Sequence, residues 1–534
     1  MADVDVLIAG AGPTGLVLAL WLARSGVRIR IVDKAADPGT TSRALVVHAR
    51  TLEFYRQLGI ADAVVDASVR FAAVNLWVAG KQAAHVELGA LGEGATAFAF
   101  MLIFPQDEHE RLLIERLSAA GVHVERPCEL RGFDERGDRI VAHLVHGDGR
   151  EERCEAAFLA GCDGAHSTVR EKLEAGFPGG TYAHVFYVAD VQASGPVMNH
   201  ELHVALDEAD LLAVFPMKGD ARARLIGTVR EGGPETTFHG GPLQTAKAPE
   251  VVSDPPPPLE WRDVSHTVLE RLGIDVSQVN WFSTYHVHHR VASHFRTGRA
   301  FLLGDAAHIH SPVGGQGMNT GIGDSANLGW KLAAAAASRI DARVLDTYEP
   351  ERIAFARQLV ATTDRAFQLA SSNGAIARFV RIRVLPRVLP QLLRLRVVRR
   401  FMFRTLSQTA IRYRESALSR GRAGSVHAGD RLPWVGLADG TERVADNYAA
   451  LSSLDWQVHV YGQAPGGVEQ ACERRTVALH VFAWRASMKR AGLARDAVYL
   501  VRPDGYVAFA DATGDGAALL RYLDDWRITT RAAA

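Results

Sequence analysis

The first 33 residues constrain the fold more than any other part of this 534-residue chain. A β-branched apolar run, Val4 to Ala9, precedes the glycine-rich stretch Gly10 to Gly15 (GAGPTG) and a segment with the pattern of an amphipathic helix. The run Val27 to Val32 predicts a second strand, and Asp33 ends it about 20 residues beyond the glycines, where a ribose-binding carboxylate is expected. The pattern predicts a parallel sheet that binds an adenine dinucleotide, and it does not distinguish NAD from FAD.

A second glycine-rich segment, Phe301 to Asn319, reads FLLGDAAHIHSPVGGQGMN. The apolar run Ala300 to Leu303 predicts a buried strand, and Asp305 follows it as a carboxylate placed to accept hydrogen bonds from sugar or ribityl hydroxyls. The glycines allow the backbone to approach a flat ring, because no Cβ stands in the way. The helix expected to follow, to about Ala337, would direct free N–H groups and a positive dipole end at that ring. These features indicate a flavin.

A third motif, Cys162 to Arg170 (CDGAHSTVR), follows the apolar run Ala156 to Gly161. Asp163 is a candidate contact for a pyrophosphate, and a helix-capping turn is the alternative. Elsewhere, a basic turn that leads into a helix contains Arg43, a candidate phosphate or ribityl contact. Gln106 stands at the start of another expected helix and is a candidate hydrogen-bond partner of the cofactor.

The three motifs in this order resemble those of the class A flavoprotein aromatic monooxygenases, the para-hydroxybenzoate hydroxylase superfamily. The resemblance covers roughly Val4 to Ala337, and its most specific part is the combination of CDGAHSTVR with FLLGDAAHIHSPVGGQGMNTGIGDSANLGWKLA. The chain looks like the long members, among them phenol hydroxylase, pentachlorophenol monooxygenase and the aromatic polyketide hydroxylases. Ser42 to Glu53 (SRALVVHARTLE) is most similar to the pentachlorophenol branch.

The resemblance implies an enzyme that uses FAD, NADPH or NADH, and dioxygen to hydroxylate a phenolic or polycyclic aromatic compound through a flavin C4a-hydroperoxide. The nicotinamide is expected to bind transiently. Baeyer–Villiger insertion, epoxidation and a non-oxygenating flavin reductase are the alternatives. By position in the motifs, the resemblance implies that FAD is bound by Gly10, Gly12, Pro13, Thr14, Gly15, Asp33, Lys34, Arg43, Gln106, Asp163, Gly304, Asp305, Pro312, Gly315, Gly317, Met318 and Asn319.

Catalytic residues are less well defined than cofactor residues. His48 is a candidate proton relay beside the flavin, although packing is the more frequent role of such a histidine. Where phenol hydroxylase has an active-site Asp shortly before its Arg-Thr-Leu-Glu, this chain has Leu45. We therefore expect the substrate-activating base to come from elsewhere or from the substrate itself. The full set of catalytic candidates is His48, Pro312, Tyr187, His203 and Arg224.

The expected fold class is α/β, with a Rossmann-like FAD-binding domain of the glutathione-reductase type in residues 1–70, 105–180 and 285–370. An inserted antiparallel-sheet substrate domain takes residues 71–104 and 181–284, and a helical linker takes 371–420. The remaining residues, 421–534, resemble the family's thioredoxin-like C-terminal domain. This domain lacks CxxC, so stability or subunit contacts are its expected use.

Two connecting segments have distinctive compositions. From Arg365 to Arg414 there is no acidic residue, and arginines alternate with Val, Leu, Ile and Phe. A basic amphipathic helix can contact an anionic membrane, but we interpret the segment as helices that bridge domains, broken at Pro386 and Pro390, with arginines paired to acids elsewhere. The run Pro255 to Pro258 predicts an exposed linker, because prolines cannot join a central strand.

Composition argues against several other classes of protein. Sixty basic and sixty acidic residues cancel, so no net field favours nucleic acid or a membrane as a partner. The four cysteines are scattered without metal-ligand spacing, which predicts buried reduced thiols and no metal site. Neither a secretory signal nor a membrane span is evident. We expect a cytoplasmic protein with a small aromatic substrate, and a homodimer is compatible with the sequence.

Overall fold

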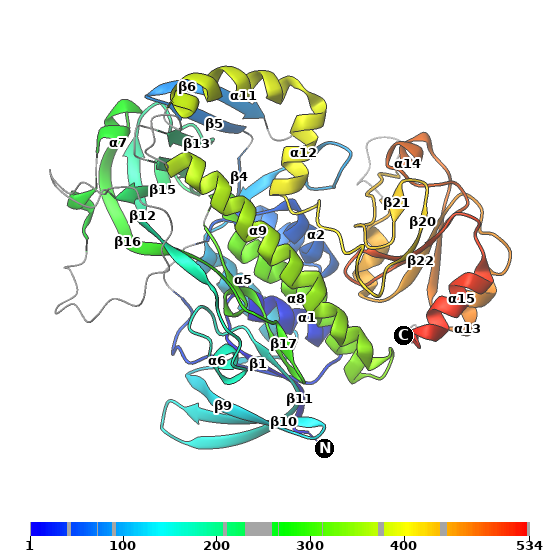
Figure 1. Ribbon diagram of the computed structural model, residues 1–534. Helices are drawn as coiled ribbons and strands as arrows, with labels where there is room; N and C mark the ends of the chain where they lie inside the picture. The colour runs from blue at the N-terminus through cyan, green and yellow to red at the C-terminus, as the bar shows by residue number, and fades with distance from the viewer. Residues whose placement is uncertain are drawn as a thin grey trace.

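The computed structural model describes residues 2–39, 44–71, 73–87, 92–206, 211–229, 259–264, 266–311, 313–371, 379–437 and 446–530. Three sheet-centred parts are visible in Figure 1, with the long helices α8 (Gln316–Ala336) and α9 (Tyr348–Ser371) crossing the centre. The expected α/β class is confirmed at this level.

The first part is built on a largely parallel sheet with strand order β17-β18-β11-β1-β2-β8, extended by the antiparallel β9–β10 hairpin. Because β1, β2, β8, β11 and β18 are parallel neighbours, the loops after their carboxyl ends meet at one edge. The strands are β1 (Val4–Ala9), β2 (Ile29–Val32), β8 (Val124–Glu125), β9 (Cys128–Arg136), β10 (Arg139–His146), β11 (Glu151–Gly161), β17 (Arg296–Thr297) and β18 (Ala300–Leu302).

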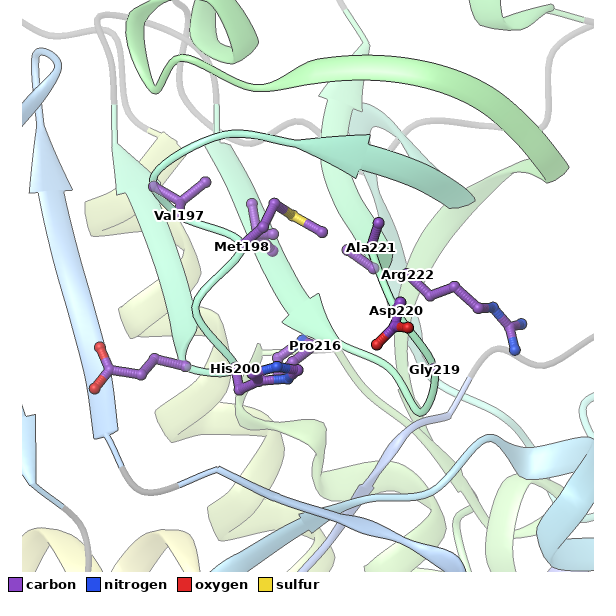
Figure 2. Close-up of a pocket in the computed structure, with 11 residues that line it drawn as sticks. Val197, Met198, His200, Pro216, Gly219, Asp220, Ala221 and Arg222 are labelled. Atoms are coloured by element: carbon purple, nitrogen blue, oxygen red, sulfur yellow. The ribbon is translucent and has the colours of Figure 1, made fainter.

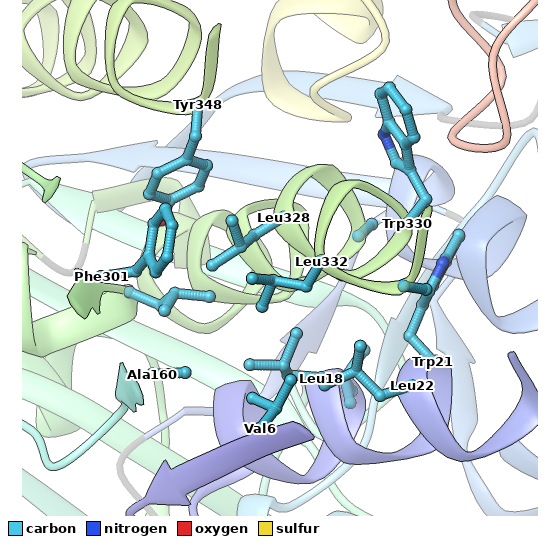
Figure 3. Packing of buried hydrophobic residues seen from close by; sticks show 14 of the residues in the cluster. Val6, Leu18, Trp21, Leu22, Ala160, Phe301, Leu328, Trp330, Leu332 and Tyr348 are labelled. Carbon is cyan, nitrogen blue, oxygen red and sulfur yellow. The ribbon is translucent and has the colours of Figure 1, made fainter. Parts of the chain in front are cut away.

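Helices α1 (Pro13–Arg24) and α8 pack together beside this sheet. Leu18 and Leu22 of α1 point toward Leu332 of α8 (Figure 3). A Cβ on Gly329 would lie 2.9 Å from the Trp21 indole, so this glycine permits the close approach of the helices. The same part contains a small sheet, β3 (Val46–Val47), β7 (Met101–Ile103) and β4 (Val69–Phe71), and the helices α2 (Ala49–Gln57), α3 (Ala61–Ala67), α5 (Gln106–Ala119) and α6 (Thr168–Lys172).

The second part is an eight-stranded sheet of order β19-β16-β12-β15-β14-β13-β5-β6, in which only the β13–β5 pair is parallel. Helix α7 (Thr267–Arg271) packs its buried residues against one face. The strands are β5 (Ala73–Val78), β6 (Lys81–Glu87), β12 (Gly179–Ser194), β13 (Leu202–Leu206), β14 (Leu211–Pro216), β15 (Arg222–Val229), β16 (Asp275–Val291) and β19 (His308–Ile309). The expected Pro255 to Pro258 linker lies outside the described residues.

Helices α11 (Leu385–Arg394) and α12 (Arg396–Leu406) follow. The predicted breaks at Pro386 and Pro390 are wrong. A π-helical turn, Val380–Val384, leads directly into α11, so the helical backbone continues through both Pro386 and Pro390, although neither proline has an N–H to donate. The interruption comes instead at Leu395, whose backbone is extended with ψ 117°.

The predicted pairing of the linker arginines with acids is also wrong for most of those described. Arg412 and Arg414 do lie beside Asp430. Among the residues that the structure describes, no carboxylate lies within ion-pair distance of the other exposed or half-buried arginines, namely Arg383, Arg387, Arg394, Arg396, Arg399, Arg400 and Arg404. Two of them donate to uncharged oxygens instead, Arg387 to Arg383 O at 2.7 Å and Arg394 to Gln391 Oε1 at 3.0 Å.

The third part is a mixed six-stranded sheet of order β21-β20-β25-β24-β22-β23. All four cysteines are free and buried, as expected, and burial raises the pKa of Cys472 in this part to about 12. Within the described residues, no helix has both the length and the hydropathy needed to cross a bilayer. The elements are β20 (Arg420–Ala423), β21 (Val426–His427), β22 (Gln457–Tyr461), α13 (Val468–Arg474), β23 (Ala478–Phe482), α14 (Ala486–Arg490), β24 (Val498–Val501), β25 (Val507–Asp511) and α15 (Gly516–Asp525).

A buried charge cluster joins the third part to the first. The Arg502 guanidinium donates to both Glu351 oxygens at 2.8 and 3.0 Å, and Lys331 Nζ donates to Glu351 at 2.9 Å. Arg502 also donates to Asp504 at 3.0 and 2.6 Å. Burial opposes ionisation of Glu351, but Arg502 and Lys331 hold its pKa far below the ordinary value. Burial in turn lowers the pKa of Lys331 to about 8.

We expect Arg502→Met to lower the free energy of unfolding by about 3–5 kcal/mol, because Glu351 would stay buried with only part of its compensation. Urea denaturation followed by tryptophan fluorescence measures this loss. Arg495→Met is the matched control: Arg495 is exposed and 3.7 Å from Asp496, so its loss should stay below about 1 kcal/mol. Equal losses in the two variants would show that the buried pair contributes no more than a surface pair.

Candidate functional site

Loops from five parallel strands gather at one edge of the first sheet. Gly10 follows β1, Asp33 follows β2 and Asp163 follows β11, while Arg126 and Asp305 come after β8 and β18. Backbone hydrogen bonds connect neighbouring loops, with Cys162 N donating to Ala9 O at 2.7 Å and Leu303 N donating to Gly161 O at 3.0 Å. The structure therefore brings the three sequence motifs together.

The glycines of the first motif differ in what surrounds them. Gly10 has φ +99°, and a Cβ there would lie 2.3 Å from Cys162 O; a Cβ on Gly15 would lie 2.0 Å from Gly10 O. Gly12 has φ −75° and no described atom within 4 Å of its Cβ position, at the N-terminus of the 12-residue helix α1. The protein's own packing thus requires Gly10 and Gly15, whereas Gly12 faces open space suited to an anionic group.

Asp33 organises the loop beside Gly12. Its carboxylate accepts from Ala11 N at 2.7 Å and from Ala35 N at 2.9 Å, and it lies 3.0 Å from the Arg126 guanidinium. Arg126 also donates to Ala11 O at 3.3 Å. Sequence reasoning missed Arg126; the signal was the short strand before it, which pairs in parallel with β2.

The loop at Gly304 rests on the first turn of α1. A Cβ on Gly304 would lie 2.7 Å from Thr14 Oγ1, and one on Gly321 would lie 2.3 Å from the same atom. Ser325 Oγ donates to Thr14 O at 2.7 Å and so ties α8 to this turn. Asp305 is exposed at the same edge. Thr14 therefore serves as the contact between the first and last motifs.

Asp324 is a second residue that sequence reasoning missed. This fully buried carboxylate accepts from Gly304 N at 3.0 Å, from His308 Nε2 at 2.7 Å and from Arg352 Nε at 2.5 Å. Burial opposes its ionisation, but Arg352 and then His308 hold its pKa below the ordinary value. Asp324 fixes the loop that presents Asp305.

Asp163 acts as a cap for the turn into α6. Ser167 Oγ donates to it at 2.5 Å and Val169 N at 3.1 Å, and burial raises its pKa. The side chain is thus engaged with the protein, while the Cβ position of Gly164 has no described atom within 4 Å. Arg170 connects this loop to the segment Phe301 to Asn319, because it donates to Ala165 O at 2.7 Å and to Ala306 O at 3.1 Å.

The loop before α8 has the left-handed backbone that glycine permits, with φ +77° at Gly314 and +62° at Gly315. A Cβ on Gly315 would lie 2.8 Å from Val46 Cβ. The Asn319 amide donates to Val46 O at 2.8 Å and Gly315 O at 2.7 Å, and accepts from His48 N at 3.0 Å. Its polar atoms are engaged within the protein, so Asn319 positions this loop.

His48 lies under the same loop, where Nε2 donates to Gly314 O at 3.0 Å. A carbonyl can only accept, so Nε2 carries the proton and Nδ1 is an acceptor. Nδ1 is buried, without a hydrogen-bond partner among the described residues. Burial lowers the pKa of His48 to about 4, so the ring is neutral near pH 7 and is a weak base.

The other expected cofactor residues have varied surroundings. Gln106 accepts from Ala44 N at 3.2 Å and donates to Glu110 at 2.8 Å, whereas Lys34 is exposed. Met318 packs against the hydrophobic core, Pro13 is buried in the first turn of α1, and Gly317 is half-buried. Arg43 and Pro312 lie outside the described residues.

Strand register separates the catalytic candidates of the second sheet. Tyr187 pairs with Gly227 and packs on Phe282, with ring centroids 6.1 Å apart, on the face that α7 covers. His203 pairs with Val214 on the same face and accepts from Trp77 Nε1 at 3.0 Å. Because side chains alternate along a strand, neither Tyr187 nor His203 faces the glycine loop before α8.

Arg224 lies on the opposite face of this sheet. It pairs in register with Phe215, and its guanidinium donates to Asp190 at 2.5 and 2.7 Å. Phe215 packs onto a hydrophobic cluster that contains Leu45 and Val46, beside Gly315. This face and the glycine loop therefore border the same apolar region. The remaining members of that cluster include Ala49, Phe71, Met101, Ile103 and Phe403.

A cavity of about 60 Å³ lies at the ends of β14 and β15, lined by His200, Pro216, Asp220 and Arg222 among others (Figure 2). It holds about two water molecules, so it is too small for an aromatic substrate. None of its lining residues belongs to the motifs or to the apolar region beside Gly315.

Comparison with known proteins agrees with this arrangement. The model of a family described as FAD binding domain matches residues 3–363. The chain is 34% identical to 6-methylpretetramide 4-monooxygenase of Streptomyces rimosus over 94% of this chain and 90% of that protein. It is 30% identical to pentachlorophenol 4-monooxygenase of Sphingobium chlorophenolicum over 70% and 66%. The solved structure of an anhydrotetracycline hydroxylase from Streptomyces rimosus superimposes with a TM-score of 0.75 at 26% identity, covering 98% and 99% of the chains.

We expect Gly12→Ala to fold normally but to bind FAD at least about tenfold more weakly, because its Cβ enters open space at a helix N-terminus that suits an anion. The ratio of flavin to protein absorbance and a flavin titration measure the binding. Gly15→Ala is the contrasting variant, since its Cβ meets Gly10 O and should lower the melting temperature of the apoprotein. Unchanged flavin affinity in Gly12→Ala would show that the pyrophosphate does not bind at this position.

The lowered pKa of His48 predicts a pH dependence of stability. Between its unfolded value, about 6.5, and its folded value, about 4, only the unfolded chain binds the proton, so stability falls as pH falls. His48→Asn should reduce this slope by up to about 1.4 kcal/mol per pH unit. Urea denaturation across this pH range measures the slope. The exposed His123→Asn is the control, and equal slopes in both variants would contradict the assignment.

Proposed function

Since the chain belongs to the FAD-dependent aromatic monooxygenases of the FAD binding domain family, we propose that it hydroxylates a polycyclic or phenolic aromatic compound. NADPH or NADH is the proposed reductant and dioxygen the oxygen donor. The observation that carries the proposal is the meeting of the three loops at Gly12, Gly164 and Asp305, beside an apolar region at Gly315.

We place the cofactor along this edge of the sheet. The N-terminus of α1 at Gly12 would take the pyrophosphate, and Asp33 with Arg126 would hold the ribose end. Asp305 would contact the ribityl chain, and the backbone from Gly314 to Met318 would line the ring. When bound, FAD supplies hydride acceptance from the nicotinamide and oxygen activation.

The substrate site that we propose lies between the glycine loop and the Phe215 face of the second sheet. Val46, Phe71, Met101 and Phe215 form apolar walls that would hold a flat ring and exclude water. Arg224 lies on the same face and would anchor a phenolic or carbonyl oxygen.

The chain's own residues limit where the proton of a phenol can go. Leu45, at the position of the phenol hydroxylase Asp, is buried in the apolar wall and has no group that can accept a proton. His48 Nδ1 is an acceptor, but with a pKa of about 4 it is too weak to deprotonate a phenol near pH 7. We therefore propose that His48 positions the loop and that Arg224 favours the phenolate through its charge.

We propose that the first sheet and its helices form a Rossmann-like FAD-binding domain, that the second sheet forms the substrate domain and that residues 421–534 form a thioredoxin-like domain without redox chemistry. Its Cys472 is buried, with a pKa of about 12, which keeps it a thiol. A cytoplasmic location and a homodimer remain part of the proposal.

The test is to purify the protein and follow NADPH and NADH oxidation in air against a panel of simple and polycyclic phenols, with mass spectrometry of each mixture. A phenol that accelerates oxidation and gains one oxygen atom supports the proposal. A preparation that binds no flavin overturns it, and so does stoichiometric hydrogen peroxide with every phenol of the panel.

The two faces of the second sheet give a sharper expectation. Arg224→Gln should lower kcat/KM for the substrate about ten- to a hundredfold, because a hydrogen bond to a charged group is lost. Tyr187→Phe, on the opposite face, should change kcat/KM less than about twofold. Flavin content and melting temperature of both variants control for folding. A large loss in Tyr187→Phe with none in Arg224→Gln would place the substrate on the other face.

A further inference from the structure

Helices α11 and α12, with the turn before them, carry nearly all large apolar side chains that the described surface exposes. Phe379 is 61% exposed, Leu395 55%, Val397 81% and Phe401 69%, and Val388 and Leu392 of α11 add to them. Outside residues 379–401, Val481 is the only such side chain among the residues that the structure describes. We call the exposed side chains of residues 379–401 the α11–α12 surface.

This surface is also strongly basic. Residues 365–414 contain twelve arginines and no acid, and the described arginines between Arg383 and Arg400 have no carboxylate within ion-pair distance in the described chain. Because acids and bases balance at 60 each overall, the rest of the chain has an excess of twelve acidic residues. A negatively charged surface would therefore attract this face and repel the others.

The position of the helices leaves their outer side unpartnered. Figure 1 shows α11 at the upper margin of the molecule beside β5 and β6, with α12 running from it toward the centre. The inner side of α12 inserts Phe403 and Leu406 into the apolar cluster that contains Val46. The helix pair thus has an outer side that combines arginines with exposed apolar side chains, and an inner side that borders the proposed substrate region.

We propose that the α11–α12 surface docks on an anionic lipid bilayer. Interleaved arginines and bulky apolar side chains match lipid phosphates and the acyl boundary beneath them. A symmetric contact between two copies would place the arginines of one copy against those of the other. A contact with a different face of a second copy would find only one exposed large apolar side chain there, Val481, among the described residues. The proposal replaces our expectation of no membrane partner, and it does not depend on the reaction catalysed.

The test is flotation of the FAD-loaded full chain with vesicles of phosphatidylglycerol and phosphatidylcholine in equal parts, against vesicles of phosphatidylcholine alone. Arg396→Gln/Arg400→Gln should lower the partition coefficient about thirtyfold, since each arginine near an anionic surface contributes about fivefold. Val397→Ser/Phe401→Ser should also lower it, and Val481→Ser should not. Circular dichroism and flavin content establish that each variant is folded.

Binding to the anionic vesicles alone, weakened by both double variants and by salt, supports the proposal. Absence of binding at low ionic strength overturns it, as does equal binding of all variants to both vesicle types. If light scattering without lipid shows oligomers that Val397→Ser/Phe401→Ser dissociates, the occupant is a second copy. If polyglutamate binds as tightly as the vesicles and Val397→Ser/Phe401→Ser has no effect, the occupant is an acidic macromolecule and the membrane proposal fails.

Discussion

The buried carboxylate of Asp324 makes the interaction on which the proposed cofactor edge depends. It holds the Gly304 loop through a backbone N–H and is balanced by Arg352 and His308, all of them away from water. An unpaired charge at such a place would cost several kcal/mol, so the three partners must be present together. They come from the end of β18, from β19 and from α9, which means that one side chain sets the relative position of three segments.

A chain of buried charges extends from this carboxylate into the C-terminal sheet. Arg352 is adjacent in sequence to Glu351, and Glu351 binds Arg502 and Lys331. A second connection runs from α2, where Glu53 accepts from Arg50 at 2.8 Å and also pairs with Arg431. The third part therefore supports the helices beside the proposed cofactor loops, which gives it a structural use.

The strands, the glycine loops and the order of the motifs could be predicted from the sequence, because local periodicity and glycine spacing determine them. The partners of the motifs could not. Arg126 and Asp324 are distant in sequence from the atoms they hold, and only the parallel pairing of β2 with β8 and the packing of α8 bring them there. The period-two pattern of the strands predicts that side chains alternate between the two faces of the sheet, but it does not identify the face that lies toward the glycine loop before α8. Tyr187 and Arg224 were therefore equal candidates for a substrate contact until the strand register was known.

The pairing of Glu351 with Arg502 has a consequence for synthesis of the chain. The two residues are 151 positions apart, which at about 5–20 residues per second separates their appearance by roughly 8 to 30 seconds. During that interval Glu351 on α9 and Lys331 on α8 lack Arg502, the arginine that later pairs with Glu351. The first sheet is complete in sequence at β18, so the helices beside it acquire the arginine that pairs with Glu351 only after the turn between β24 and β25 has been made.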